Sequence, residues 1–264
     1  MAYLAKSYGP AVEARMSVLS MSSTGHSAAI VEYLNPSVCL PATIIQTDGA
    51  AIILDLSIGS DALGEPLKNL PVDRFSQLVD RAMLSADSGF AFGRWGEPRD
   101  LYSSGLFAND AEPRIIHMGV DLFCRAGTPV YAPLDGRIHI KTNNKAELDY
   151  GPMLVLQHET TNGEVFYSLY GHLSLADISH VDEGQTVSAG ERIATVGSPP
   201  ENGNWPPHLH FQLILDLLDR GADFPGVCLR SEQEKWLGLS PLPAMFFSEC
   251  DGQLLDGRIP AARP

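Results

Sequence analysis

The sequence predicts a mainly β protein, with an antiparallel core over about residues 111–216. From Arg114 onward, short apolar and β-branched runs alternate with turns rich in glycine and proline. Short strands at such regular spacing are typical of antiparallel sheets. A second observation is the run His208–Leu213, in which polar and apolar residues alternate as they do along a strand. We therefore expect the chain to be organised around a β core that contains this strand.

The residues before this core combine helical and extended patterns, so we expect an α+β N-terminal extension over residues 1–110. Two β-rich runs between Ala42 and Leu56 flank Asp48-Gly49, a dipeptide typical of tight turns, and they predict a hairpin. Asp73 is a candidate N-cap for a helix that follows. Apolar residues then recur at helical spacing and predict a packing face: Phe75, Leu78, Val79, Ala82 and Met83.

Two further segments flank the core. Residues 90–102 mix aromatic side chains with glycines and arginines, which suits a loop that lines a cleft. A surface loop with its aromatic side chains turned inward explains the same composition. After the core, we expect a C-terminal tail over residues 217–264, in which Ser231-Glu-Gln-Glu234 is a capping-box pattern that opens a short helix through Trp236.

Composition and charge restrict the classes of function. With 264 residues and 44% apolar content, the chain is long enough to bury a sizeable core. Its formal net charge is −14, because 32 acidic residues outnumber 18 lysines and arginines, and this argues against a nucleic-acid partner. No apolar run approaches the roughly 20 residues that span a bilayer, so we expect no membrane span.

The N-terminal residues contain no charged segment followed by an apolar stretch, the pattern of a secretory signal. We therefore expect a cytoplasmic location. The cysteines lie far apart, without a CxxC pair, and in a chain of this size they are expected to be reduced: Cys39, Cys124, Cys228 and Cys250.

Histidines and a carboxylate predict a metal site. In a strand, His208 and His210 project from the same face, so both imidazoles point toward one place. His117 and Asp121 are four residues apart, a spacing that places them on one face of a strand or a helix. Two imidazoles and one carboxylate suit Zn²⁺, and three protein ligands leave one tetrahedral position for water, as in a catalytic zinc site.

These segments resemble the motifs of the M23 zinc metallopeptidases, the lysostaphin-like group. That family has an HxxxD segment, a later HLS-type segment and an HxH strand, in this order. The corresponding residues here are His117 to Asp121, His172-Leu-Ser174 and His208-Leu-His210. The resemblance covers about residues 112–215. It includes the segments that flank the motifs, such as Gly127-Thr-Pro-Val-Tyr-Ala-Pro133 and Gly184-Gln-Thr-Val187.

The resemblance implies a lysostaphin-like, sandwich-like β core with the site in a groove. It implies that His117, Asp121 and His210 bind Zn²⁺ and that His172 and His208 are the catalytic histidines. It also implies an endopeptidase that cleaves an amide by attack of metal-bound water, on peptidoglycan-type peptides. The residues leave open which of the two histidines is the base.

Two other functions are compatible with the same residues. One is an intracellular hydrolase of a small amide metabolite, and the other is a non-catalytic binding or scaffold module that keeps the fold. The segments Asn202-Gly-Asn-Trp-Pro-Pro207 and Trp236-Leu-Gly-Leu-Ser-Pro241 resemble an M23 subgroup that is associated with class III aminotransferases, which suggests an aminotransferase partner. No aminotransferase sequence is present in this chain.

Several other residues have structural explanations. A histidine near a strand end is more often structural than functional, and we interpret the remaining ones in this way: His26, His139, His158 and His180. Cys124 follows Asp121 by three residues and would face away from it in a strand, so we assign it to the core. Trp205 lies three residues before His208, where its ring would either form a wall of the groove or fill the edge of the core.

Overall fold

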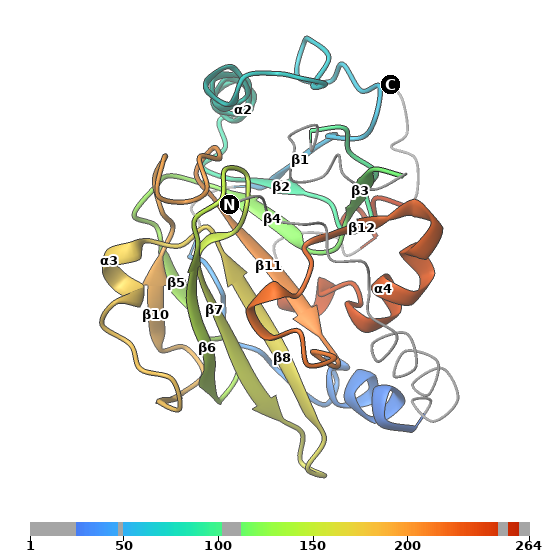
Figure 1. Cartoon of the computed structure of the whole chain (residues 1–264), viewed down its shortest axis with the longest axis vertical. Helices are drawn as coiled ribbons and strands as arrows, with labels where there is room; N and C mark the ends of the chain where they lie inside the picture. Colours follow the sequence, from blue (N-terminus) through green and yellow to red (C-terminus); the bar gives the residue numbers. More distant parts are fainter. Residues whose placement is uncertain (1–24, 47–49, 102–111, 248–252, 259–264) are drawn as a thin grey trace.

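The computed structural model describes residues 25–46, 50–101, 112–247 and 253–258. Its centre is an eight-stranded sheet (Figure 1), in which all neighbours are antiparallel except the parallel edge pair β1 and β2. In sheet order, the strands are β1 (Ile52–Leu54), β2 (Ala91–Gly93), β4 (Val120–Phe123), β11 (His208–Ile214), β8 (Val165–Gly171), β7 (Gly151–Glu159), β6 (Gly136–Asn144) and β9 (Thr186–Val187). The mainly β, antiparallel fold predicted from the sequence is confirmed.

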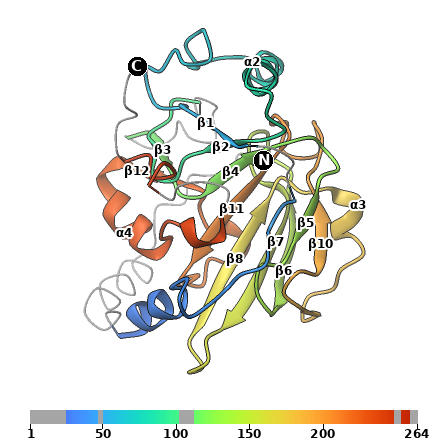
Figure 2. The same ribbon diagram turned by 180° about the vertical axis from the view of Figure 1, so that it is seen from behind.

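Two smaller sheets and several short helices complete the described fold. Strands β5 (Pro129–Tyr131) and β10 (Arg192–Thr195) pair with each other, and so do β3 (Arg114–His117) and β12 (Val227–Leu229). Residues 25–33 are helical. Further helices are α2 (Val72–Ser85), α3 (Leu175–Ile178) and α4 (Gln233–Leu239), with 3₁₀ turns η1 (Gly221–Asp223), η2 (Arg230–Glu232) and η3 (Ala244–Phe246). In both views, α2 lies at the end of the molecule near β1, and α3 lies beside β10 (Figures 1 and 2).

The main hydrophobic core joins the large sheet to the β5–β10 sheet. Val130 of β5 and Ala194 of β10 belong to the same buried cluster as Leu154 of β7 and Leu209 of β11. A second cluster forms where the N-terminal segment meets the sheet, and it includes Leu56, Phe75, Leu78, Phe123 and Trp205. This second cluster places residues of the N-terminal segment close to β4 and to the loop before β11.

The two runs predicted to form a hairpin around Asp48-Gly49 have other partners in the described residues, and the turn itself lies outside the described residues. Ile45, from the first run, bridges Val130, whereas β1, from the second run, pairs in parallel with β2. A hairpin alone has few partners. The edge of the large sheet offers the second run a neighbouring strand, and β5 of the β5–β10 sheet offers a partner to the first. The large sheet therefore includes residues on both sides of position 110, and the predicted domain boundaries stay predictions.

The two N-caps predicted from the sequence, Asp73 and Ser231, each lie one or two residues from the observed N-cap. The predicted helix is present as α2, with Phe75, Leu78 and Val79 buried, but Asp73 lies in its first turn and Pro71 occupies the N-cap. The capping box at Ser231 is wrong: the N-cap of α4 is Glu232, and the Ser231 hydroxyl donates to Glu112 Oε2 at 2.5 Å. A carboxylate distant in sequence thus takes the hydroxyl that would have capped the helix.

Across the described residues, none of the helices is long and apolar enough to cross a lipid bilayer. Cys39, Cys124 and Cys228 are buried free thiols, in agreement with the reduced state expected for them.

Candidate metal and catalytic site

The register of the large sheet places four site positions in one row. Gly93 of β2 lies opposite Asp121 of β4, Asp121 lies opposite His210 of β11, and His210 lies opposite Gly171 of β8. Paired residues on neighbouring strands project to the same face of a sheet. The side chains of Asp121 and His210 therefore meet, although 89 residues separate them.

His117 joins this pair from the end of β3. Its Nε2 lies 3.1 Å from Asp121 Oδ1 and 3.1 Å from Nδ1 of His210. The distance from His210 Nδ1 to Asp121 Oδ1 is also 3.1 Å. All three side chains are buried. The three residues expected to be ligands thus present one atom each to a common point.

The outer ring nitrogens of both histidines have fixed partners. Nδ1 of His117 lies 2.8 Å from the carbonyl oxygen of Arg94. Nε2 of His210 lies 3.0 Å from Oε1 of Gln212. A carbonyl oxygen can only accept, so each outer nitrogen carries the proton and each inner nitrogen presents a lone pair. Such partners orient imidazole ligands in metal sites.

The cluster therefore suits a cation. Two lone pairs and a carboxylate oxygen meet 3.1 Å apart in a buried place, an arrangement that is repulsive unless a positive charge lies among them. A tetrahedral zinc ion with ligand bonds of about 2.0–2.1 Å holds its ligand atoms about 3.3 Å apart. His117, Asp121 and His210 thus form a group that could hold a metal ion.

Gly119 provides the space that His210 occupies. A Cβ at this position would lie 2.6 Å from Cε1 and Nε2 of His210 and 2.7 Å from the carbonyl oxygen of Phe211. Real Cβ atoms essentially never approach other atoms so closely. A side chain at position 119 would therefore displace the imidazole.

His172 and His208 lie beside the cluster as a second pair. Their ring centroids are 4.3 Å apart, and Nε2 of His208 is 3.8 Å from Asp121 Oδ1. Nδ1 of His172 lies 2.8 Å from the Asn202 carbonyl, and Nδ1 of His208 lies 2.6 Å from the Pro206 carbonyl. By the same reasoning, each Nδ1 carries a proton and each Nε2 is free to accept one.

The backbone holds His172 in an unusual conformation. Its φ is +62°, a left-handed value that is uncommon for residues other than glycine. The backbone N–H of His172 donates to the Tyr150 carbonyl, and its own carbonyl accepts from the N–H of Gly197. Strained residues of this kind persist where surrounding contacts hold them, and they concentrate at functional sites.

Burial keeps His117, His172 and His208 neutral. Desolvation, followed by the nearby Arg99 charge, lowers the pKa of His117 to about 4. Desolvation also lowers the pKa of His172 and of His208, and the neighbouring histidines lower that of His172 further. Burial alone would raise the pKa of Asp121, but His117 and Arg99 together hold it well below its usual range. At neutral pH, His117, His172 and His208 are thus neutral and Asp121 is ionised.

The five residues open onto a pocket of about 210 Å³. Its apolar lining includes Leu56, Phe75 and Leu101 from the N-terminal segment and Trp205 from the loop before β11. Phe123 also lines this pocket, and its ring stacks on His208 at a centroid distance of 4.9 Å. Charged and polar residues also line it: Arg114, Asn144, Asp149, Arg220 and Asp223. The pocket can therefore hold a ligand that has both apolar and polar groups.

Trp205 both packs at the edge of the core and forms part of the pocket wall, the two positions considered for it. It is buried in the second hydrophobic cluster with 8% of its surface exposed, and it also lines the pocket. Its ring centroid is 6.3 Å from those of His172 and His208.

Cys124 lies in the core, as expected. His158, expected to be structural, is buried outside this pocket, with its ring nitrogens near the Asp135 carbonyl and the Ser168 hydroxyl.

Some residues of the site were missed in the sequence. Gln212 continues the alternation of His208 and His210 along β11, so its spacing alone predicts the shared face. Arg94, Glu97 and Arg99 lie in the segment predicted to be a loop lining a cleft, of which residues 91–93 instead form β2. All three are buried and joined by ion pairs. Two arginines close to a glutamate in the sequence do not indicate that these charged side chains are buried.

Residues 115–219 match the model of Peptidase family M23. This match confirms the resemblance found in the motifs of residues 112–215.

The chain is similar to curated endopeptidases over this region. It is 35% identical over 99 residues to the peptidoglycan DD-endopeptidase ShyA of Vibrio cholerae, a match that covers 38% of this chain and 20% of the relative. It is 31% identical over 108 residues to the L-Ala–D-Glu endopeptidase of Bacillus subtilis, covering 39% of this chain and 31% of the relative. The chain thus spans about a fifth to a third of the length of these relatives.

Among solved structures, the catalytic domain of lysostaphin from Staphylococcus simulans is 26% identical to this chain. The match covers 53% of this chain and 85% of that domain, with a TM-score of 0.35. These comparisons do not bear on an aminotransferase partner, which stays a prediction.

Proposed function

We propose that the protein is a zinc-dependent endopeptidase-type hydrolase that cleaves an amide bond in peptidoglycan-type peptides. The observation that carries this proposal is the convergence of His117, Asp121 and His210 beside a second, neutral histidine pair. Structural zinc sites are closed by four protein ligands, whereas hydrolytic sites keep one position open. Three ligands beside a pocket agree with the second kind.

The substrate class rests on the relatives. Two of them are named as endopeptidases of peptidoglycan or of an L-Ala–D-Glu bond. The pocket offers apolar and charged walls, which suits a peptide with both methyl and carboxylate groups. We therefore propose a peptidoglycan fragment as the substrate.

In this proposal, His117, Asp121 and His210 would hold Zn²⁺ through the atoms that face one another: Nε2, Oδ1 and Nδ1. Bound zinc supplies a Lewis acid that activates water and polarises the scissile carbonyl. The chain contributes the orientation of these ligands, because Arg94 and Gln212 hold the two imidazoles by their outer nitrogens. It also excludes bulk water, since all three ligands are buried.

His172 and His208 supply the proton transfers. Each presents an unprotonated Nε2, because its Nδ1–H donates to a backbone carbonyl. One imidazole takes a proton at its Nε2 from the attacking water, and the imidazolium formed in this way gives that proton to the leaving amine. Either ring can take this role, because both present an unprotonated Nε2. The lowered pKa of both rings keeps them available as bases at neutral pH.

A digestion experiment tests this function. Purified protein, supplied with one equivalent of zinc, is incubated with peptidoglycan fragments and separately with small N-acyl amino acids. Products are identified by mass spectrometry, with His172→Ala as the inactive variant and His139→Ala as a control outside the pocket. We expect new amino termini in the peptide stems. Cleavage of the small amides alone would support the small-amide hydrolase instead, and no cleavage in either set would support a non-catalytic module.

A further inference from the structure

We propose that Arg99, held by Glu97, is a positioning residue of the metal site. It occupies one oxygen of the Asp121 carboxylate and thereby leaves only the other to face the ligand cluster. This inference depends on the proposed function only in that the cluster binds zinc. Both residues lie outside the region that matches the family model, which begins at residue 115.

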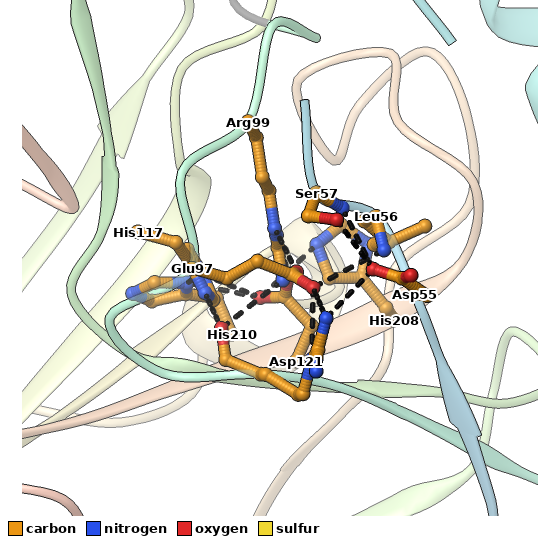
Figure 3. Close-up of polar contacts among 10 residues, drawn as sticks. Asp55, Leu56, Ser57, Glu97, Arg99, His117, Asp121, His208 and His210 are labelled. Carbon is orange, nitrogen blue, oxygen red and sulfur yellow. Dashed lines mark hydrogen bonds and ion pairs between the residues drawn. The ribbon is translucent and has the colours of Figure 1, made fainter. Parts of the chain in front are cut away.

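The two oxygens of Asp121 have separate partners. Oδ1 faces Nε2 of His117 and Nδ1 of His210, each at 3.1 Å. Oδ2 accepts a hydrogen bond from Nη1 of Arg99 at 2.7 Å. Figure 3 shows the guanidinium of Arg99 pointing toward the carboxylate. A carboxylate with one oxygen held in this way presents a single oxygen to a metal.

Arg99 is itself held on its other side. Its Nε donates to Glu97 Oε2 at 2.8 Å, and its Nη2 donates to the Arg94 carbonyl at 3.3 Å. Glu97 is fully buried, and its Oε1 accepts from Nε and Nη2 of Arg94 at 2.9 and 2.6 Å. The Arg94 guanidinium also pairs with Asp55 at 2.7 Å. The planar guanidinium of Arg99 thus bridges two carboxylates in a fixed direction.

The same segment holds a second ligand. The Arg94 carbonyl oxygen that accepts from Arg99 Nη2 also accepts from Nδ1 of His117, at 2.8 Å. The backbone fixes the segment against β3, because His117 N–H donates to the Glu97 carbonyl and Arg99 N–H donates to the Ile115 carbonyl. Residues 94–99 therefore set the outer contacts of two of the three ligands.

Gly93 gives independent support. A Cβ at this position would lie 2.7 Å from Arg99 Nη2 and 3.3 Å from Asp121 Oδ2. The end of an arginine side chain usually yields at little cost, but here it is buried and bonded to Glu97, Asp121 and a carbonyl. The absence of a side chain at position 93 thus permits the contact between Arg99 and Asp121.

Lysine cannot replace Arg99 in this role. An ammonium group keeps the charge but lacks the planar fork that reaches two carboxylates at once. A lysine at position 99 would therefore contact Glu97 or Asp121, and Asp121 would be free to rotate. Because Arg99 acts on Asp121, its loss should alter metal binding even without substrate.

The test measures metal binding in Arg99→Lys and in Gly93→Ala, which changes no charge. The Zn²⁺ dissociation constant is obtained by competition with a chelator, and the visible spectrum of the Co²⁺-loaded protein reports the coordination number. The matched controls are Arg81→Lys, on α2, whose side chain donates to the Leu63 carbonyl outside the pocket, and Gly238→Ala, a site with no atom within 4 Å of a new Cβ.

We expect zinc affinity to fall by about 10- to 100-fold in both variants, the usual effect of losing an outer partner of a ligand. The Co²⁺ absorption should weaken as Asp121 turns to offer both oxygens. The controls should stay within about threefold of the unsubstituted protein. If either variant fails to fold, the other decides. Unchanged zinc affinity and an unchanged Co²⁺ spectrum would overturn the inference, whereas failure of the unsubstituted protein to bind zinc would overturn the proposed function.

Discussion

The side-chain oxygen of Gln212 accepts the Nε2–H of His210 at 3.0 Å. The amide nitrogen of Gln212 donates to the Pro225 carbonyl at 3.2 Å and to the Ser240 hydroxyl at 2.8 Å. Because the Pro225 carbonyl can only accept, the amide cannot be reversed, and its oxygen must face His210. Gln212 thus fixes which nitrogen of His210 is available to a metal.

This relationship predicts the effect of Gln212→Ala. The His210 ring loses its outer acceptor, so zinc affinity should fall by about 10- to 100-fold. Competition with a chelator measures the change, and Gln77→Ala on the exposed face of α2 is the control. Equal zinc affinity in Gln212→Ala and in the control would show that the ring is held by packing alone.

A second prediction separates ligands from catalytic residues. His210→Ala and Asp121→Ala should each lose bound zinc, because each removes one of three ligands. His172→Ala and His208→Ala should keep zinc but lower turnover by roughly 10² or more, the scale of a lost acid, base or oxyanion partner. Metal content and turnover are measured on the same samples. A folded His172→Ala protein without metal would mean that a ligand and a catalytic residue had been exchanged.

The third prediction concerns pH. The folded pKa of His117 and of His158 is lowered to about 4, mainly by burial, from an unfolded value near 6.5. Between these values the unfolded chain binds more protons, so the free energy of unfolding must fall as the pH decreases from 6.5 toward 4. Each of the two histidines should lower it by about 2 kcal/mol between pH 7 and pH 5.

Urea unfolding of the zinc-free protein at pH 7 and pH 5 measures this loss. Asp121, whose pKa is lowered, contributes in the opposite window: its stabilisation is complete above its unfolded pKa and is lost only at more acidic pH. It should not affect this comparison. Equal unfolding free energies at pH 7 and pH 5 would contradict the neutral state assigned to the histidines.

The site residues could be proposed from the sequence because the spacing of residues within the motifs determines which side chains share a face. His208 and His210 share a face through strand alternation, and the order of the three segments identified Asp121 and His172 as their neighbours. The main strands of the core were predicted for the same reason, since strand periodicity is a local property.

What could not be predicted depends on distant partners. The run that forms β1 has the residue pattern of a hairpin strand. It nevertheless pairs with β2, which lies far along the chain. Arg99 and Asp121 are 22 residues apart, and no periodicity links them. The burial of Glu97 depends on ion pairs with both Arg94 and Arg99, and these contacts are known only from the folded structure.

Trp205 gives the fourth prediction. Since it is packed with Leu56 and Phe75 in the second hydrophobic cluster, Trp205→Ala should cost about 3–5 kcal/mol of stability. Trp205→Phe should preserve most of the packing and should raise KM more than it lowers kcat, as expected when binding to the pocket wall is lost. Kinetics on a peptidoglycan peptide, together with thermal unfolding, measure both effects. Unchanged KM in a stable Trp205→Phe protein would assign Trp205 to the core alone.

The most direct test is a zinc titration of the metal-free protein, with hydrolysis of a peptidoglycan peptide as the readout. If His117, Asp121 and His210 hold one catalytic zinc ion, activity should be absent at first, rise linearly and stop rising at one zinc per chain. His210→Ala should stay inactive throughout the titration. Full activity of the metal-free protein, or activity in His210→Ala equal to that of the unsubstituted protein, would contradict the account.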